Sequence, residues 1–417
     1  MLAFKRIISF NLIFGIIMAM FIPAMAIVSC RRDGRDLRVG LFGVEQVLQK
    51  KSPYENPTDP NRTIFRYAPG ITILEYPFLL KSRMTAPYQF ESFTPSILAW
   101  YFAEILALIF SAFILLKLTP SLPPAVSWRN LKIGFLMSLP LIGYELSNCQ
   151  NKLVALFFVL LAILLFERKR MLLSAISLCL GLTIYIPLLF FALYLLIKSR
   201  GRFALSFIAG ALIVFIIGPS LIWGFKFNNF LLKDWYDYAL KPFIFTHSYA
   251  SYIDLRASSQ SLPSSIGRIF VSGHTETFKY LISPELVHII IKVFSAVIVL
   301  LSCLALWKRS KSASEGLGLA VFLILALIIP LYCIYYTWAW LFVIYFFVLN
   351  YTTSPGAPNT EKKVLLVLTS IMFLSTCLIG VTILKRNSFI FWATFILWLG
   401  MSCALLKEAF GRKVLTK

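Results

Sequence analysis

The chain has 417 residues, 59% of them hydrophobic and only 14% charged, whereas a soluble domain is about 45–50% apolar. This composition excludes an ordinary soluble enzyme, because lipid must cover the apolar surface that a folded core cannot bury. The net charge of +22 comes from basic residues scattered between apolar runs, a pattern that argues against nucleic-acid binding and favours anionic membrane lipids as partners.

Apolar runs along the chain predict about twelve membrane-spanning helices, and hence an all-α polytopic membrane protein forming one integral membrane domain over residues 1–417. The predicted spans are 7–29, 95–117, 132–147, 152–167, 171–184, 186–198, 203–224, 286–307, 316–334, 338–351, 364–384 and 388–406. Pro187 separates two of these spans, although 171–198 could also form one long kinked helix.

Lysine and arginine gather in the connections that this count places on the side of the N-terminus. The positive-inside rule then predicts that both termini are cytoplasmic and that the protein lies in the cell membrane. Lys385 and Arg386 are exceptions, because they fall on the opposite side. The first span could be a cleavable signal, but its apolar run is longer than a typical signal core, so we expect it to be retained.

Two polar segments, 30–94 and 225–285, fall outside the cytoplasm and are longer than simple connectors require. We therefore expect the functional residues there. In the first segment, residues 36–51 place Leu37, Leu41, Val44 and Leu48 at helical spacing, which predicts an amphipathic helix on the membrane surface.

Asp36 opens this predicted helix, and two interpretations of its carboxylate remain open. It could cap the helix, as aspartate often does. It could also be a general base at the membrane interface, where a lipid-linked substrate presents its reactive head.

Four elements in order resemble the polyprenol-phosphate-mannose-dependent α-1,2-mannosyltransferases, which are GT-C-class membrane enzymes. The first is an aspartate soon after the first span, followed by Pro53-Tyr54 and then Tyr67-Ala68-Pro69. The second is Asn148-Cys149-Gln150-Asn151, similar to the family's Asn-Gly-Gln-x-Asn, with Cys149 in place of the usual glycine.

The third and fourth elements lie in the second half of the chain. Ser259-Gln260-Ser261-Leu262, followed by Arg268, resembles the family's Asn-Gln-Ser-Leu with its downstream arginine. The stretch from Pro330 to Trp340 is similar to a family segment that leads to a histidine pair, but here Tyr335-Tyr336 stand near that position and no histidine is present.

The resemblance implies a GT-C-type bundle that transfers a hexose, by inheritance mannose, from a polyprenyl-phosphate donor to a hydroxyl of a glycolipid or glycan, with inversion. Asp36 would be the catalytic base, with Asp33 as its nearest rival. The donor phosphate or sugar would be bound by Gln260, Ser261 and Arg268, and the cavity would be lined by Asn148, Gln150, Tyr335 and Tyr336.

We expect no metal and no cofactor, because the acids do not form the paired carboxylate cluster that a divalent cation prefers and Arg268 can neutralise the phosphate. The acids placed within spans, Glu104 and Glu145, are candidates for a functional role because charge at membrane depth is costly. Trp338 and Trp340 are expected to belong mainly to an interfacial aromatic belt. The alternatives are a transporter or flippase for lipid-linked or anionic solutes, and a glycan polymerase or ligase.

Overall fold

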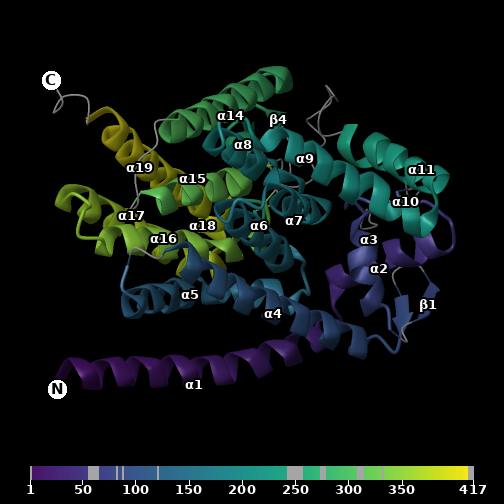
Figure 1. Cartoon of the computed structure of the whole chain (residues 1–417), viewed down its shortest axis with the longest axis horizontal. Helices are drawn as coiled ribbons and strands as arrows, with labels where there is room; N and C mark the ends of the chain where they lie inside the picture. The colour runs from purple at the N-terminus through teal and green to yellow at the C-terminus, as the bar shows by residue number, and fades with distance from the viewer. Residues whose placement is uncertain are drawn as a thin grey trace.

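The computed structural model describes residues 2–54, 65–80, 83–86, 89–119, 122–241, 257–272, 279–307, 314–330 and 333–411. Helices account for most of these residues, and the strands form two short antiparallel pairs, β1 with β2 and β3 with β4. The all-α class expected from the sequence is confirmed (Figure 1).

The helices of the first half are α1 (Leu2–Arg31), α2 (Arg35–Leu48), α3 (Ile71–Glu75), η1 (Tyr76–Phe78), α4 (Thr94–Leu118), α5 (Pro124–Ser147), α6 (Lys152–Glu167), α7 (Met171–Ile184), η2 (Ile186–Leu188) and α8 (Leu189–Lys198). Those of the second half are α9 (Phe203–Ala211), η3 (Leu212–Ile217), α10 (Gly218–Trp223), α11 (Phe225–Trp235), η4 (Tyr236–Leu240), α13 (Leu262–Ile269), α14 (Pro284–Trp307), α15 (Glu315–Ile328), η6 (Thr337–Trp340), α16 (Leu341–Thr353), α17 (Asn359–Cys377), η7 (Leu378–Gly380), α18 (Thr382–Arg386) and α19 (Phe389–Gly411). The strands are β1 (Arg83–Ala86), β2 (Gln89–Glu91), β3 (Val271–Ser272) and β4 (Lys279–Tyr280).

Within the described ranges, six helices are long and apolar enough to cross a membrane, or seven if α5 and α6 are counted as one bent span. Shorter apolar helices of 10–17 residues occupy other predicted spans, among them α7 and α15. A multi-pass membrane protein is therefore confirmed. The count of about twelve spans stays a prediction, because at 1.5 Å per residue the shorter helices reach across only part of a bilayer.

The predicted break at Pro187 is confirmed. Tyr185 has an extended backbone with φ −147° and ψ 99°, and the short 3₁₀ helix η2 follows it before α8 begins. Proline cannot continue the hydrogen-bond ladder of α7, so the chain turns there instead of forming one long helix.

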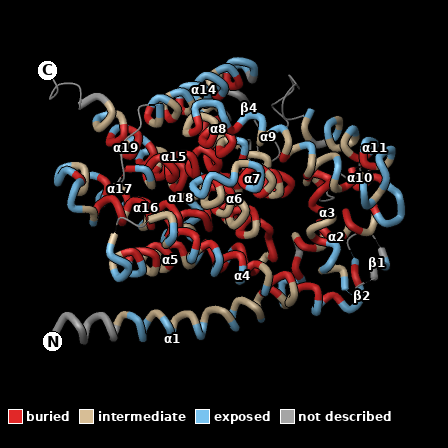
Figure 2. The backbone as a smooth tube through the Cα atoms, in the orientation of Figure 1, coloured by how far each residue is buried: buried red, intermediate tan, exposed pale blue. Residues whose placement is uncertain are grey.

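The centre of the bundle is formed by α15 and α16, whose side chains are buried almost all round (Figure 2). Trp338 and Trp340, at the start of this central segment, are both 0% exposed. The prediction that they belong to an interfacial belt is therefore wrong. Because η6 enters the interior of the bundle, these two rings pack inside the protein and not at a lipid surface.

Helix α1 lies at the edge of the bundle and is largely exposed, as expected for a helix that packs against lipid (Figures 1 and 2). The N- and C-termini lie toward the same end of the molecule in Figure 1, whereas α2, α3 and β1 lie at the other end. The described elements α2, α3 and β1 of the polar segment after α1 therefore lie at the end away from both termini.

Helix α2 differs from its prediction in two respects. It begins at Arg35 with Gly34 as its N-cap residue, so Asp36 lies inside the first turn and does not cap the helix. Its apolar side chains Leu37 and Leu41 pack in one cluster with residues of α4, and so this face meets protein where we expected it to meet the membrane surface. Leu48, expected on the same face, is 47% exposed.

Candidate functional site

The junction between α1 and α2 fixes the position of Asp36. Ser29 Oγ donates a hydrogen bond to the carbonyl oxygen of Leu146 (2.7 Å), and Arg32 Nη1 donates to Ser147 Oγ (3.0 Å), so the end of α1 is fastened to the end of α5. Gly34 then turns the chain with a left-handed φ of 48°. Asp36 is half-buried in the first turn of α2, where the helix dipole stabilises a negative charge.

The segment Asn148–Asn151 forms the bend between α5 and α6, whose axes differ by 118°. Cys149 adopts a left-handed φ of 49° in this bend. Only glycine reaches that conformation without strain, and for other residues it costs about 1–2 kcal/mol. A glycine, as in the Asn-Gly-Gln-x-Asn pattern that this segment resembles, would adopt this backbone freely, whereas the chain carries a strained cysteine there.

Glu145 caps the N-terminus of α6 across this bend. Its Oε1 accepts hydrogen bonds from the backbone N–H groups of Lys152 (2.8 Å) and Leu153 (3.2 Å), which have no partner within the helix. Glu104 of α4 is also fully buried, and its charge interacts with that of Glu145. The two intramembrane acids singled out from the sequence therefore lie in one buried group.

Lys152 is a functional candidate that the sequence interpretation missed. Its side chain is only 7% exposed, and its Nζ lies 5.4 Å and 4.9 Å from the ring centroids of Tyr67 and Tyr185. It also donates a hydrogen bond to Asn151 Oδ1 (3.1 Å). The ammonium interacts electrostatically with three carboxyl groups from different helices, namely Glu145, Asp36 and Glu75.

Glu75, at the end of α3, contributes the third carboxyl group. It is 2% exposed and packs against Gly40 of α2, where a β-carbon would overlap its carboxylate. Gly40 lies one helical turn after Asp36, so both acids adjoin the same face of α2. Burial raises the pKa of Glu75 to about 8, although a hydrogen bond from Asn151 and the charge of Lys152 lower it in part.

This raised pKa predicts a pH-dependent stability. Between pH of about 4.5 and about 8 the folded protein holds a proton on Glu75 that the unfolded chain has lost. The free energy of unfolding should therefore fall as pH rises through this window, by at most about 1.4 kcal/mol per pH unit. Thermal unfolding of the purified protein at pH 5.5 and 7.5 should show this loss, and Glu75→Gln, which mimics the protonated acid, should reduce it. An identical pH dependence in the variant would contradict the assignment.

The third and fourth sequence elements pair with each other. Ser259 and Ile334 form an antiparallel bridge, and the backbone N–H of Gln260 donates to the carbonyl oxygen of Cys333 (2.8 Å). Ser261 is the N-cap residue of α13 and accepts a hydrogen bond from the N–H of Ser264 (3.3 Å). The loop before α13 is thereby held against the loop before η6.

Gln260 and Ser261 are both fully buried, and their side chains bond within the protein. Gln260 Nε2 donates to the carbonyl oxygens of Ala257 (2.8 Å) and Lys385 (3.0 Å). Ser261 Oγ shares a hydrogen bond of 2.9 Å with Ser264 Oγ. Through these hydrogen bonds, both side chains hold the loop before α13 in place.

Arg268 is more accessible than these supports and connects α13 to the start of α19. Its guanidinium donates to the carbonyl oxygen of Ser259 (2.8 Å) and, through Nε, to Ser388 Oγ (3.1 Å). The Tyr335 hydroxyl donates to the carbonyl oxygen of Ala257 (2.6 Å), and the charge of Arg268 acts on this phenol. Tyr336 beside it is half-buried.

The two halves of the site meet at a pair of tyrosines. The rings of Tyr144 and Tyr335 are edge to face, with centroids 6.4 Å apart, and Asn148 Nδ2 donates to the carbonyl oxygen of Tyr144 (2.6 Å). Trp340 Nε1 donates to the carbonyl oxygen of Lys152 (2.9 Å), which connects η6 with α6. These contacts join Asn148, Gln260, Ser261, Arg268 and Tyr335, whereas Asp36 is connected to them through its electrostatic interaction with Lys152.

Gln150 lies on another side of the bend. It is 2% exposed, and its carbonyl oxygen accepts a hydrogen bond from Trp100 Nε1 (3.2 Å) of α4. Its side-chain Nε2 has no hydrogen-bond partner among the described residues. Gln150 therefore ties the bend to α4, away from the tyrosine pair.

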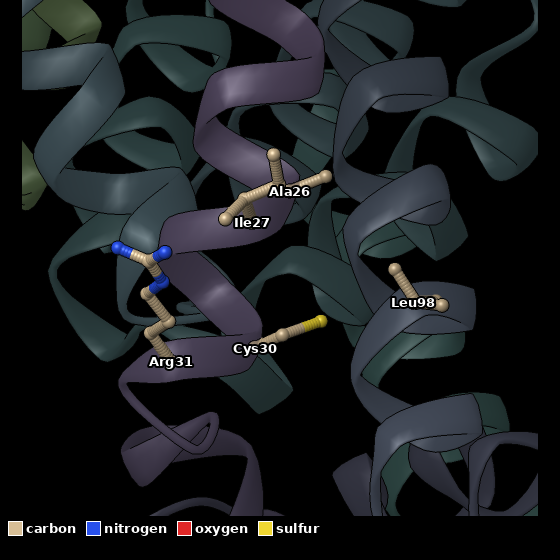
Figure 3. Close-up of a pocket in the computed structure, with 5 residues that line it drawn as sticks. All are labelled: Ala26, Ile27, Cys30, Arg31 and Leu98. Carbon is tan, nitrogen blue, oxygen red and sulfur yellow. The ribbon is translucent and has the colours of Figure 1, made fainter.

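A groove of about 380 Å³ opens between α1 and α4 near this site (Figure 3). It is lined by Ala26, Ile27, Cys30, Arg31 and Leu98. Its lining is mainly apolar, and its one charged residue, Arg31, is the last residue of α1. The groove thus lies beside a peripheral helix. Its last lining residue on α1 is Arg31, which precedes Asp36 by five residues.

Within the described ranges, no three His, Cys, Asp or Glu side chains gather closely enough to hold a metal ion. The fold and this site define a multi-pass membrane protein with a buried charged centre at the end of the bundle away from its termini. The chain belongs to glycosyltransferase family 87, whose family model matches residues 65–330, well over half of its length. A search of the curated proteins finds no match.

Membership in this family makes the chain a membrane glycosyltransferase and displaces the transporter interpretation. The matched region contains Glu75, Lys152, Gln260 and Arg268. It begins after Asp36 and ends before the tyrosines at 335 and 336.

Proposed function

We propose that this membrane glycosyltransferase moves a hexose, mannose by resemblance, from a polyprenyl-phosphate donor to a hydroxyl group of a glycolipid or glycan. The reaction takes place on the extracytoplasmic side of the cell membrane, and both termini are cytoplasmic. The observation that carries the proposal is that Arg32, four residues before Asp36, and Arg268, far apart in the sequence, both lie beside the contacting pair Tyr144 and Tyr335.

In the proposed reaction, the Asp36 carboxylate takes the proton of the acceptor hydroxyl. The acceptor oxygen attacks the anomeric carbon as the bond from that carbon to the phosphate oxygen breaks, and polyprenyl phosphate leaves. Arg268 stabilises the charge that develops on the leaving phosphate, because a guanidinium matches a phosphate with two parallel hydrogen bonds. A single displacement of this kind inverts the anomeric centre, by analogy with inverting glycosidases.

The surrounding residues have supporting roles in this scheme. Gln260 and Ser261 were expected to bind the donor directly, but their buried hydrogen bonds favour a role in holding the loop that presents Arg268. Asn148, Tyr335 and Tyr336 remain proposed lining residues for the sugar. The groove between α1 and α4 satisfies the need for an apolar surface that admits a lipid chain (Figure 3).

Membranes that contain the expressed chain test the donor class. We expect transfer of radiolabel from a set of polyprenyl-phosphate hexoses and none from nucleotide-sugars, with the same rate in the presence of a divalent-metal chelator. Addition of single hexoses separates this activity from a glycan polymerase or ligase, which would make long or pre-assembled products. Transfer from nucleotide-sugars alone would overturn the proposed donor.

A further inference from the structure

The short helix α18 lies between α17 and α19 and carries Lys385, a cation on the side of the membrane where the positive-inside rule does not expect one. The structure connects this lysine to the candidate site by two contacts. Its carbonyl oxygen accepts a hydrogen bond from Gln260 Nε2 (3.0 Å), and its Nζ lies 5.3 Å from the centroid of the Tyr335 ring.

Arg268 is held beside the same tyrosine. Its Nε donates to Ser388 Oγ (3.1 Å), and Ser388 lies just after α18, so one turn of chain fixes both cations. The charge of Arg268 acts on the Tyr335 phenol, whose ring also receives the Lys385 ammonium. An ammonium from α18 therefore lies over the Tyr335 ring, and the charge of a guanidinium from α13 acts on the phenol of the same residue.

A third cation extends this group toward Asp36. The Arg32 guanidinium lies 5.7 Å from the centroid of the Tyr144 ring, and Tyr144 contacts Tyr335 edge to face. Within the described ranges, no ion pair joins Arg32 or Lys385 to a carboxylate. Positive charges that lie close together repel one another and attract an anion.

An ordinary alternative is that Lys385 only extends toward the polar surface of the membrane, as interfacial lysines do. Arg386, the next residue of the same helix, fits that description because it is exposed and makes none of these contacts. Lys385 is half-buried, rests on Tyr335 and is fixed through its backbone by Gln260. The difference between these neighbours favours a binding role for Lys385.

We propose that Lys385, together with Arg268, binds the phosphate of a lipid-linked substrate, so that α18 completes the anion site. An ammonium interacts with phosphate as a compact point charge and a guanidinium as a planar fork, and the two are complementary around one phosphate. This proposal rests on the proposed function for the identity of the lipid. The same phosphate chemistry is also offered by bilayer headgroups and by inorganic phosphate.

Binding of polyprenyl monophosphate to the full chain in phosphatidylcholine nanodiscs tests this proposal. We expect Lys385→Gln to weaken binding about 10-fold, equivalent to about 1.4 kcal/mol, and to raise the KM for the donor more than it lowers kcat. Lys385→Arg should retain most of the affinity because it keeps the charge. Arg386→Gln is the matched control and should bind as the wild type does.

A measurement on the unaltered protein does not depend on whether these variants fold. Polyprenyl monophosphate should protect Lys385 from an acylating reagent, as mapped by mass spectrometry, while exposed Lys363 of α17 reacts equally with and without the ligand. Inorganic phosphate and phosphatidylglycerol, tested at the same concentration, should protect Lys385 less.

The outcomes separate this proposal from the function on which it rests. If the wild-type chain neither binds polyprenyl monophosphate nor uses its hexose derivative, the proposed function fails. If it does both, but Lys385 is not protected and Lys385→Gln behaves as Arg386→Gln does, the role of Lys385 is overturned and the function stands. Equal protection by phosphatidylglycerol would assign the site to bilayer headgroups and overturn its role in binding the donor.

Discussion

Replacement of Asp36 by asparagine is expected to lower kcat for sugar transfer by about 10²–10⁴-fold, the usual contribution of a general base. Asparagine keeps the shape of the side chain but cannot take the acceptor proton. Because Gly34 is the N-cap residue and the Asp36 side chain does not cap α2, the helix should still form. The rate is measured with purified protein, and thermal unfolding in detergent shows whether the fold is retained.

Asp33→Asn is the matched control, because Asp33 lies three residues earlier and is the nearest rival for the base. Its side chain is 58% exposed and forms an ion pair with Arg38. Exposed ion pairs contribute about 0–1 kcal/mol, so this variant should lose little activity or stability. A large loss in Asp33→Asn together with normal transfer in Asp36→Asn would move the base to the rival position.

Replacement of Lys152 by methionine should reduce both stability and activity strongly. Methionine has a similar length but no charge, so Glu145 and Asp36 would lose the cation with which they interact. Removing one partner of a direct buried ion pair costs about 3–5 kcal/mol. Lys152 forms no direct ion pair among the described residues, so the loss of stability should lie below that figure. Thermal unfolding and the transfer rate measure the two effects. Lys363→Met, at an exposed lysine of α17, should change neither.

A double-mutant cycle separates the charge of Lys152 from its packing. Glu145→Gln removes one negative charge, while its remaining side-chain oxygen can still accept the two backbone hydrogen bonds at the start of α6. Combined with Lys152→Met, it should therefore recover part of the lost stability. Simple addition of the two single losses would contradict an electrostatic coupling between these residues.

The class of the fold could be predicted from the sequence because composition and apolar runs depend on local chemistry alone. The same holds for the break at Pro187 and for the bend at Asn148–Asn151, where a proline and a polar run interrupt apolar segments. The positions of Trp338 and Trp340 could not be predicted in this way. A tryptophan near the end of an apolar run has the same sequence pattern whether it packs against lipid or, as here, inside the bundle.

The contacts of the candidate site depend on pairing between distant segments. The bridge between Ser259 and Ile334 and the packing of Glu75 on Gly40 bring together parts of the chain with no local sequence signal. The sequence predicted that Gln260 and Ser261 bind the donor, whereas their burial and their hydrogen bonds within the protein became visible only in the structure.

One signal in the sequence could have identified Lys152 and Lys385 as candidate site residues. Lys152 and Lys385 both lie at ends of apolar segments that the predicted topology places outside the cytoplasm, where lysine is unusual. In the structure each of them contacts tyrosine rings at the candidate site. A lysine that departs from the positive-inside pattern is therefore a reasonable candidate to test for a binding role in this chain.

The central claim is that this chain transfers a sugar from a polyprenyl phosphate through the site around Asp36. The most direct test is the stoichiometry of a single turnover of the purified protein in liposomes with a polyprenyl-phosphate hexose and a glycolipid acceptor. We predict one polyprenyl phosphate released for each hexose transferred and an inverted anomeric centre in the product. With Asp36→Asn, both products should form about 10²–10⁴-fold more slowly. A retained anomeric centre, a covalent adduct of sugar and enzyme, or equal turnover by Asp36→Asn would contradict the account.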